Sequence, residues 1–266
     1  MKQTILKALI TFLTLGTCSA ADFATEMVDA TFKFFNADST STCFLVRRPE
    51  PDAAYYLVTA AHTVALTKGE KAVLVLREPK PDGSYERRDH PIPIRQGDKP
   101  LWVHHEKQDV AVLRISDPLP VAIPGIPLSM LADAARLKAA DVHVASQLYV
   151  LTYPQRFEAN AAGFPIARTG IFASPPMLPM ATHPTFFADF TTFAGDSGGP
   201  VFIPGADGHP LVVGITIAQT HHEDHLKSEY EDRTIKYPLG IGTVLHAQYV
   251  LETIEAAAKP AEPASK

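Results

Sequence analysis

The feature that most constrains the fold of this chain is a series of short apolar runs, each ending at residues that break regular structure. The breaks include "RPEPD", "PKPDG" and "RQGDKP", and the 23 prolines are scattered along the chain. Scattered prolines suit many short strands joined by turns better than long helices. The runs predicted as strands are 31–35, 42–48, 55–61, 71–78, 109–116, 141–154, 166–174, 184–190, 199–203, 210–218 and 240–245. Strands at this spacing predict an all-β protein, either barrels or sandwiches.

Two segments have the pattern of helices. Residues 128–138 could supply a short connecting helix. Near residues 245–259 apolar side chains recur at helical spacing on one side, which predicts a helix at 246–259 that docks on the body. The Pro/Ala-rich tail at 260–266 is predicted to be disordered.

The first twenty residues have the order of a secretory signal. Lys2 and Lys7 precede the apolar stretch 8–15, and small residues follow at 18–21. We therefore expect residues 1–20 to be a cleaved signal peptide and the protein to be exported, either periplasmic or secreted. A membrane anchor is the alternative, but the apolar run is too short to span comfortably. A lipid anchor on Cys18 is a further alternative, disfavoured by Thr17 before it.

Composition and charge limit the kinds of partner that this protein is expected to bind. The net charge of −5 is modest and no Lys/Arg-rich run is present, so no nucleic-acid partner is expected. No segment after the signal is long and apolar enough to predict a membrane span. If Cys18 leaves with the signal, Cys43 is a single cysteine in a strand-like run. An exported chain without a disulfide must depend on its core, and Cys43 is expected to be buried within it.

Three polar side chains stand at the ends of apolar strands. His62 follows the strand in "LVTAAHTV", Asp109 opens the strand in "QDVAVLRI", and Ser197 lies in "GDSGGP". Taken singly, such residues are usually solvated or capping. A serine hydroxyl, however, is a weak nucleophile that needs a base within hydrogen-bond reach, oriented by a third group. Ser, His and Asp together provide these three roles.

The glycine-rich turn at 195–200 strengthens this interpretation. Glycines weaken backbone order at the entrance of a strand, so a role other than stability is indicated. The N–H groups of Gly195 and Ser197 could face one point and form an oxyanion hole. One such donor is worth on the order of a hundred- to a thousand-fold in rate.

In this order, "TAAH", "DVAVL" and "GDSGGP" resemble the three catalytic signatures of the chymotrypsin/trypsin-like serine proteases, in a bacterial-type, disulfide-free form. The resemblance covers roughly residues 30 to 250. It implies two packed six-stranded antiparallel β-barrels, at 22–118 and 119–245, with the active site between them. A C-terminal α-helix at 246–259 would follow.

The resemblance also implies residue roles: Ser197 as nucleophile, His62 as general base, and Asp109 as the carboxylate that orients His62. His104 and His105 are weaker candidates than His62 for the base, and Asp117 is a weaker candidate than Asp109 for the carboxylate. Asp196 resembles the buried acid beneath the oxyanion loop, which in activated zymogens of the family pairs with a new N-terminus. No "IVGG"-like start is present, so Asp196 is expected to find another partner or a hydrogen bond.

The substrate pocket is predicted from the same resemblance. Thr191 takes the place of the pocket floor, where no Asp is present, so a preference for Lys or Arg is not supported. The strand "GITIAQT" should form the wall and pair with the substrate backbone. We expect a small or uncharged residue before the scissile bond. The predicted pocket residues are Thr191, Thr192, Ile217, Ala218 and Gln219.

Residues 220–233 gather three histidines with carboxylates. A metal site is conceivable there, but such charged runs are more often solvated loops, so no metal and no cofactor is predicted.

The sequence thus predicts an exported serine endopeptidase whose partner is a polypeptide substrate. The alternative is a catalytically latent or inactive protease-fold module that binds proteins, with Phe193 and Gln219 closing the cleft. The sequence leaves the physiological substrate and the oligomeric state open.

Overall fold

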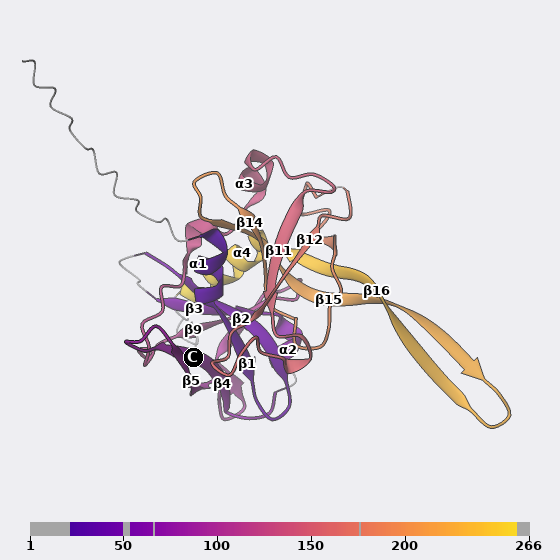
Figure 1. Cartoon of the computed structure of the whole chain (residues 1–266), viewed down its shortest axis with the longest axis horizontal. Coiled ribbons are helices and arrows are strands. Elements are labelled where there is room, and N and C mark those ends of the chain that lie inside the picture. The colour runs from indigo at the N-terminus through magenta and orange to yellow at the C-terminus, as the bar shows by residue number, and fades with distance from the viewer. Residues whose placement is uncertain (1–21, 50–53, 66, 176, 260–266) are drawn as a thin grey trace, which may run out of the picture.

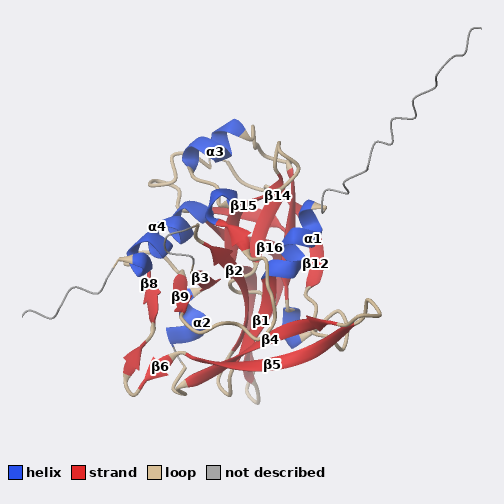
Figure 2. Ribbon diagram, turned by 90° about the vertical axis from the view of Figure 1, so that its left-hand side faces the viewer, coloured by secondary structure: helices blue, strands red, loops and turns tan. Residues whose placement is uncertain are grey.

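The computed structural model describes residues 22–49, 54–65, 67–175 and 177–259. The predicted signal peptide at 1–20 and the predicted tail at 260–266 lie outside the described residues. The chain forms two large antiparallel sheets with short helices around them (Figures 1 and 2). The helices are α1 (Phe23–Ala30), α2 (Ala61–Ala65), α3 (Ala134–Ala139) and α4 (Ala247–Ala258).

The first sheet has eight strands. Its path is β5-β4-β1-β2-β3-β9-β8, and β10 pairs with β2 in parallel. The bounds are β1 (Thr31–Phe35), β2 (Thr40–Arg47), β3 (Tyr55–Thr59), β4 (Lys71–Pro79), β5 (Tyr85–Pro93), β8 (Trp102–His104), β9 (Ala111–Ile115) and β10 (Ile126–Pro127). A small separate hairpin joins β6 (Arg95–Gln96) to β7 (Lys99–Pro100).

The second sheet has six strands in the order β12-β11-β14-β15-β16-β13. The bounds are β11 (Gln147–Thr152), β12 (Ile166–Ile171), β13 (Thr185–Asp189), β14 (Pro200–Pro204), β15 (Pro210–Lys227) and β16 (Asp232–His246). Its two end strands approach each other through one isolated bridge between Phe172 and Ala188.

The predicted fold class is confirmed at the level of a mostly β chain with a small C-terminal helix. The eight-stranded first sheet differs from the predicted six strands, and β5 and β8 remain separate edges of it among the described residues. Closure of both sheets into six-stranded barrels therefore stays a prediction, as do the domain boundaries at 118 and 245.

Several elements differ from their predicted extents. The strand predicted at 141–154 begins only at Gln147, because Asp141 and Ala145 have positive φ angles of 51° and 72° that interrupt an extended chain. The helix predicted at 128–138 is split into a 3₁₀ turn at Leu128–Met130 and α3, whose N-cap Asp133 accepts the Arg136 N–H at 2.8 Å.

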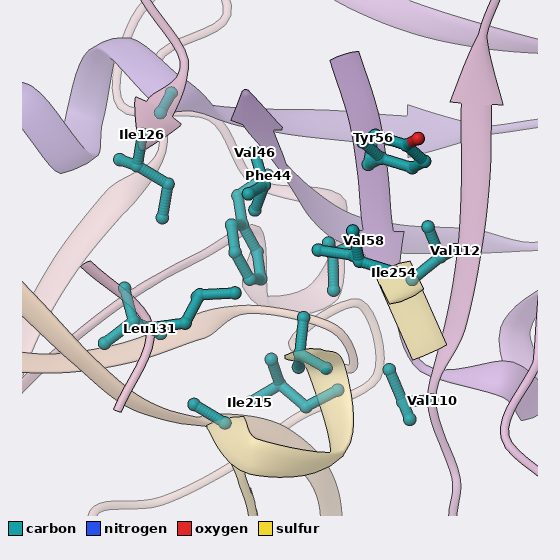
Figure 3. Close-up of a cluster of buried hydrophobic side chains, with 14 of the residues drawn as sticks. Phe44, Val46, Tyr56, Val58, Val110, Val112, Ile126, Leu131, Ile215 and Ile254 are labelled. Atoms are coloured by element: carbon teal, nitrogen blue, oxygen red, sulfur yellow. The ribbon is translucent and has the colours of Figure 1, made fainter. Parts of the chain in front are cut away.

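Both faces of the central strands are buried, which explains their nearly continuous apolar sequence. In β2, Cys43 and Leu45 face a cluster inside the first sheet, whereas Phe44 and Val46 face a second cluster shared by both sheets. The shared cluster also contains Ile215 of β15 and Ile254 of α4 (Figure 3). It fixes the two sheets and the C-terminal helix relative to each other.

One of the buried titratable groups is an imidazole. His246, the last residue of β16, is fully buried and lies 5.0 Å from the ring of Phe186 between ring centroids. Burial, with a smaller contribution from nearby His183, lowers the pKa of His246 from 6.5 to about 4. The folded protein therefore holds this imidazole neutral where the unfolded chain protonates it.

This difference predicts a loss of stability in mild acid. Between pH 6.5 and 4 the unfolded chain binds one more proton at His246, so the free energy of unfolding should fall as pH falls, by up to about 1.4 kcal/mol per pH unit. Urea unfolding at pH 7, 6 and 5 measures this slope. His246→Phe should flatten it, and an unchanged slope in that variant would contradict the assignment.

Candidate active site

Three side chains predicted from the sequence lie in hydrogen-bond contact. His62 is in α2, Asp109 lies two residues before β9, and Ser197 lies in the loop between β13 and β14. His62 Nδ1 is 2.6 Å from Asp109 Oδ2, and His62 Nε2 is 3.0 Å from Ser197 Oγ. The His62 backbone N–H also donates to Asp109 Oδ1 at 2.9 Å. The carboxylate therefore fixes both the backbone and the ring of His62.

Local structure places His62. Strand β3 ends at Thr59, and Ala60 is fully buried before the single turn of α2 begins. Thr63 Oγ1 donates to the Ala60 carbonyl at 2.7 Å, which holds this turn against the strand end. The small alanines of "TAAH" allow the abrupt change from strand to helix.

Asp109 is placed by a turn that His105 organises. Nδ1 of His105 lies 3.1 Å from the backbone nitrogens of both Lys107 and Gln108, which donate to it. Its Nε2 lies 3.0 Å from the Glu252 carboxylate of α4. The rival His105 is thus engaged in holding the turn before Asp109.

The two other alternative candidates, His104 and Asp117, also lie apart from Ser197 and His62. Asp117 lies beyond the far end of β9, whereas Asp109 precedes its start. His104 directs its Nδ1 to the carbonyl of His105, at 3.1 Å.

The charge state of Asp109 follows from opposing effects. Burial raises the pKa of its carboxyl, but hydrogen bonds from the His62 side chain and backbone outweigh burial and hold the pKa below 3.8. Asp109 is therefore a carboxylate at neutral pH. A carboxylate accepts a hydrogen bond from Nδ1–H, which leaves Nε2 free to accept the Ser197 proton.

Thr42 of β2 holds the loop between β13 and β14, called the serine loop because it carries Ser197, against the first sheet. Thr42 Oγ1 donates to the Gly195 carbonyl at 2.8 Å, and the Thr42 N–H donates to the Ser197 carbonyl at 3.0 Å. A Cβ at Gly198 would clash with the Thr42 carbonyl and with Thr59, while Gly198 also has a φ of +85°. Glycine is required where the loop passes this closely against the first sheet.

Two backbone donors beside Ser197 are available. Within the described residues, neither the Gly195 N–H nor the Ser197 N–H donates a hydrogen bond. Gly195 has a φ of +98°, and a Cβ there would clash with the Tyr153 carbonyl. These are the two groups predicted to form an oxyanion hole.

Asp196 pairs with Arg168 of β12. The carboxylate is 1% exposed, and its Oδ2 accepts from Arg168 Nη2 at 2.6 Å and from the Phe193 N–H at 2.8 Å. Arg168 also donates to Thr152 Oγ1 at 2.7 Å and to the Thr191 carbonyl. The Arg168 guanidinium therefore holds the loop that carries Ser197, through its contact with the Asp196 carboxylate.

The predicted pocket residues lie on two segments beside Ser197. Thr192 is buried, and its hydroxyl is 3.5 Å from the Ala218 carbonyl, which links the segments. Thr191 is half-buried, and a Cβ at Gly240 would meet only its Oγ1, at 3.7 Å. Ile217 is half-buried, whereas Ala218 and Gln219 are exposed.

The charged run at 220–233 is not a loop as predicted, because most of it continues strands β15 and β16. His221 pairs with Glu223 at 2.9 Å, and His222 pairs with Asp224 at 3.0 Å. Among the described residues, no group of three or more His, Cys, Asp or Glu side chains is placed to hold a metal ion.

Sequence reasoning missed Arg168, Thr42 and Glu252 as supports of the site. Only Asp196, a carboxylate expected to be buried, indicated that another partner or a hydrogen bond had to be supplied from elsewhere. Cys43 is buried with a free thiol, and burial raises its pKa. None of the helices in the described residues is long and apolar enough to cross a bilayer.

Comparison with known proteins agrees with this architecture. The fold is similar to two crystal structures of inactive forms of Rv3671c from M. tuberculosis H37Rv. The first, a serine-to-alanine mutant, has 18% identity and a TM-score of 0.50, over 90% of this chain and 93% of that chain. The second, called a protease, has 16% identity and a TM-score of 0.50, over 89% and 93%. At these identities the similarity shows the fold alone.

No curated protein matches the sequence. The family model described as the trypsin-like peptidase domain matches residues 41–215, which is more than half of the chain and includes His62, Asp109 and Ser197. The chain therefore belongs to the trypsin-like peptidase family.

Proposed function

We propose that this chain is an exported serine endopeptidase that cleaves peptide bonds with Ser197, His62 and Asp109. The observation that carries the proposal is the hydrogen-bonded series from Asp109 through His62 to Ser197, with distances of 2.6 and 3.0 Å. Beside it lie two backbone N–H groups that donate to none of the described residues. A base, an orienting carboxylate and an oxyanion hole are the groups that activate a serine for acyl transfer.

The first half of the reaction forms an acyl-enzyme. Ser197 Oγ attacks the carbonyl carbon of the substrate and transfers its proton to His62 Nε2. The carbonyl oxygen becomes an oxyanion and accepts hydrogen bonds from the Gly195 and Ser197 N–H groups. His62 then donates the proton to the leaving amine as the carbon–nitrogen bond breaks.

The second half returns the enzyme to its starting state. A water gives its proton to His62 Nε2 and attacks the ester carbon of the acyl-enzyme, and the same N–H groups hold the second oxyanion. The carbon–oxygen bond to Ser197 breaks, and Oγ recovers the proton from His62. Throughout, the Asp109 carboxylate holds the ring and stabilises its charged form.

The side chain before the scissile bond would enter the space beside Thr191. The pocket residues supply hydroxyl, amide and apolar groups and no charge, and Gly240 leaves room beside Thr191 Oγ1. We therefore propose a preference for small or uncharged side chains at this position, without a requirement for Lys or Arg. The backbone of the substrate would pair with β15 near Ile217, Ala218 and Gln219.

Export is part of the proposal and rests on the signal-like order of residues 1–20. Helix α1 packs into the body, with Met27 and Ala30 fully buried, so a mature chain that begins at Ala21 would keep this helix. Fractionation of expressing cells and N-terminal sequencing test this: a new N-terminus at Ala21 outside the cytoplasm supports export, and an intact Met1 in the cytoplasm contradicts it.

The activity is tested by labelling the purified protein with a fluorophosphonate, which reacts with activated serines. We expect labelling of the wild type and at least a hundredfold slower labelling of Ser197→Ala and His62→Ala. Asp117→Asn, at the far end of β9, is the matched control and should label normally. If folded wild-type protein is not labelled, the latent or protein-binding alternative is favoured.

A further inference from the structure

Beyond Gln219, the proposed reaction does not use the ribbon formed by the outer parts of β15 and β16, residues 219–239. It extends away from the rest of the molecule (Figure 1). Its turn is held by Ser228, whose N–H donates to the Glu231 carbonyl at 2.7 Å and whose Oγ accepts the Glu231 N–H at 3.0 Å. Two-stranded ribbons are marginal in water on their own, so a contact that covers this one would stabilise it.

The ribbon begins beside Ser197. The Gly198 N–H donates to the Thr216 carbonyl at 2.8 Å, and the Thr216 N–H donates to the Gly199 carbonyl at 2.9 Å. At this point β15 leaves its neighbour β14 and afterwards pairs only with β16 in the described residues. The open edge of β15 therefore starts at the serine loop.

The open edge runs from Gln219 to Lys227. Beyond Thr216, none of the described residues forms a hydrogen bond with the backbone on this side of β15, except the Thr192 hydroxyl, which contacts the Ala218 carbonyl. Nine residues of strand cover roughly 30 Å. Long open edges are sites where another chain can pair.

The two faces of the ribbon differ. On one face the charges are paired, with Glu223 2.8 Å from Lys236 and 2.9 Å from His221. The cross-strand register places Leu226, Ile235 and Tyr237 on the other face, together with Arg233 and the His222–Asp224 pair at 3.0 Å. Leu226 of β15 and Tyr237 of β16 are 45% and 46% exposed, and Leu226 lies on the strand that carries the open edge.

We propose that the open edge of β15 from Gln219 to Lys227 binds the substrate chain as an added strand, far upstream of the scissile bond. This rests on the proposed function and narrows its substrate class to polypeptides that are extended for about ten residues before the cleaved bond. The added strand would pair its backbone with β15, and its side chains would lie beside Leu226.

The direction of β15 decides which side of the substrate is bound. From Thr216 the strand runs away from Ser197, so an antiparallel partner runs towards Ser197 and ends there. The bound residues are therefore those on the acyl side, and the leaving side stays free of the ribbon. Folded substrates and short peptides cannot use the ribbon, which makes it selective for unfolded segments.

Length dependence tests the proposal. Peptides with identical residues at the scissile bond are extended upstream in steps of two, from four to twelve residues, and kcat/KM is measured for each. We expect at least a tenfold rise, mainly through KM, that ends near ten residues. N-methyl groups on the upstream backbone should reduce kcat/KM at every second position, because alternate N–H groups of an added strand face β15.

A shortened ribbon is the matched variant. Replacing residues 224–235 by Asn-Gly keeps the Glu223–Lys236 pair as the closing pair of a two-residue turn and removes four positions of the edge. In this variant the rise of kcat/KM with upstream peptide length should end about four residues earlier than in the wild type. Fluorophosphonate labelling reports separately whether Ser197 is still activated, so failure of the ribbon and failure of the proposed function are distinguished.

Three outcomes would overturn the proposal. The first is labelled wild-type enzyme whose kcat/KM does not change with upstream length. The second is an N-methyl series without alternation. The third is a wild type that sediments as a dimer and a shortened variant that sediments as a monomer with unchanged length dependence, because the ribbon would then cover a second copy of this chain.

Discussion

Asp109→Asn is expected to lower kcat about ten-thousand-fold while leaving the fold intact, a magnitude appropriate to an amide in this role. In the wild type, Oδ1 of Asp109 accepts the His62 backbone N–H at 2.9 Å and Oδ2 lies 2.6 Å from Nδ1. Asparagine has one oxygen for these two partners. If this oxygen still accepts the His62 backbone N–H, the NH₂ group of the asparagine faces Nδ1 of the ring. Nδ1 must then accept a hydrogen bond, so the ring proton lies on Nε2 and His62 can no longer accept the proton of Ser197.

Turnover and fluorophosphonate labelling of Asp109→Asn measure this effect, with thermal unfolding as the check on the fold. Asp117→Asn provides the control, because it removes a charge from the other end of β9. A loss of less than tenfold in Asp109→Asn would contradict the orienting role. An equal loss in Asp117→Asn would point to the overall charge instead.

The three candidate site residues, His62, Asp109 and Ser197, could be singled out because each lies where an apolar strand changes to another structure. "TAAH" marks the end of β3, "QDVAV" the start of β9, and "GDSGGP" a loop whose glycines permit close approach to a neighbouring chain. Such signals are local in sequence. The sequence could not give the distances between them, since these depend on contacts such as Thr42 with Gly195, 153 residues apart.

Strands buried on both faces were also predictable, as the runs at 42–48 and 55–61 show. Strand β5 was not, because Tyr85–Pro93 is mostly exposed and carries charges and prolines, and only its register along β4 makes it a strand. The ribbon was missed for the same reason: its charges resemble those of a solvated loop, while cross-strand pairs such as Glu223–Lys236 keep it extended.

Arg168→Met is the second variant with a large expected effect. It should lower the free energy of unfolding by about 3–5 kcal/mol, because it leaves a buried carboxylate without its cation. Asp196 is 1% exposed, and Arg168 Nη2 is 2.6 Å from its Oδ2. Activity should fall by roughly a hundredfold or more, since Oδ2 also accepts the Phe193 N–H and thereby shapes the loop that presents the Gly195 and Ser197 N–H groups.

The double variant Arg168→Met, Asp196→Leu separates stability from activity. Replacing both buried charges by apolar groups should restore much of the stability, since the penalty of an unpaired carboxylate is gone. Activity should stay low, because no carboxylate then holds the Phe193 N–H. Urea unfolding and labelling rates measure the two quantities. If the double variant recovered activity along with stability, Arg168 and Asp196 would act only by stabilising the fold; continued inactivity in a stable protein would show that their ion pair shapes the oxyanion hole.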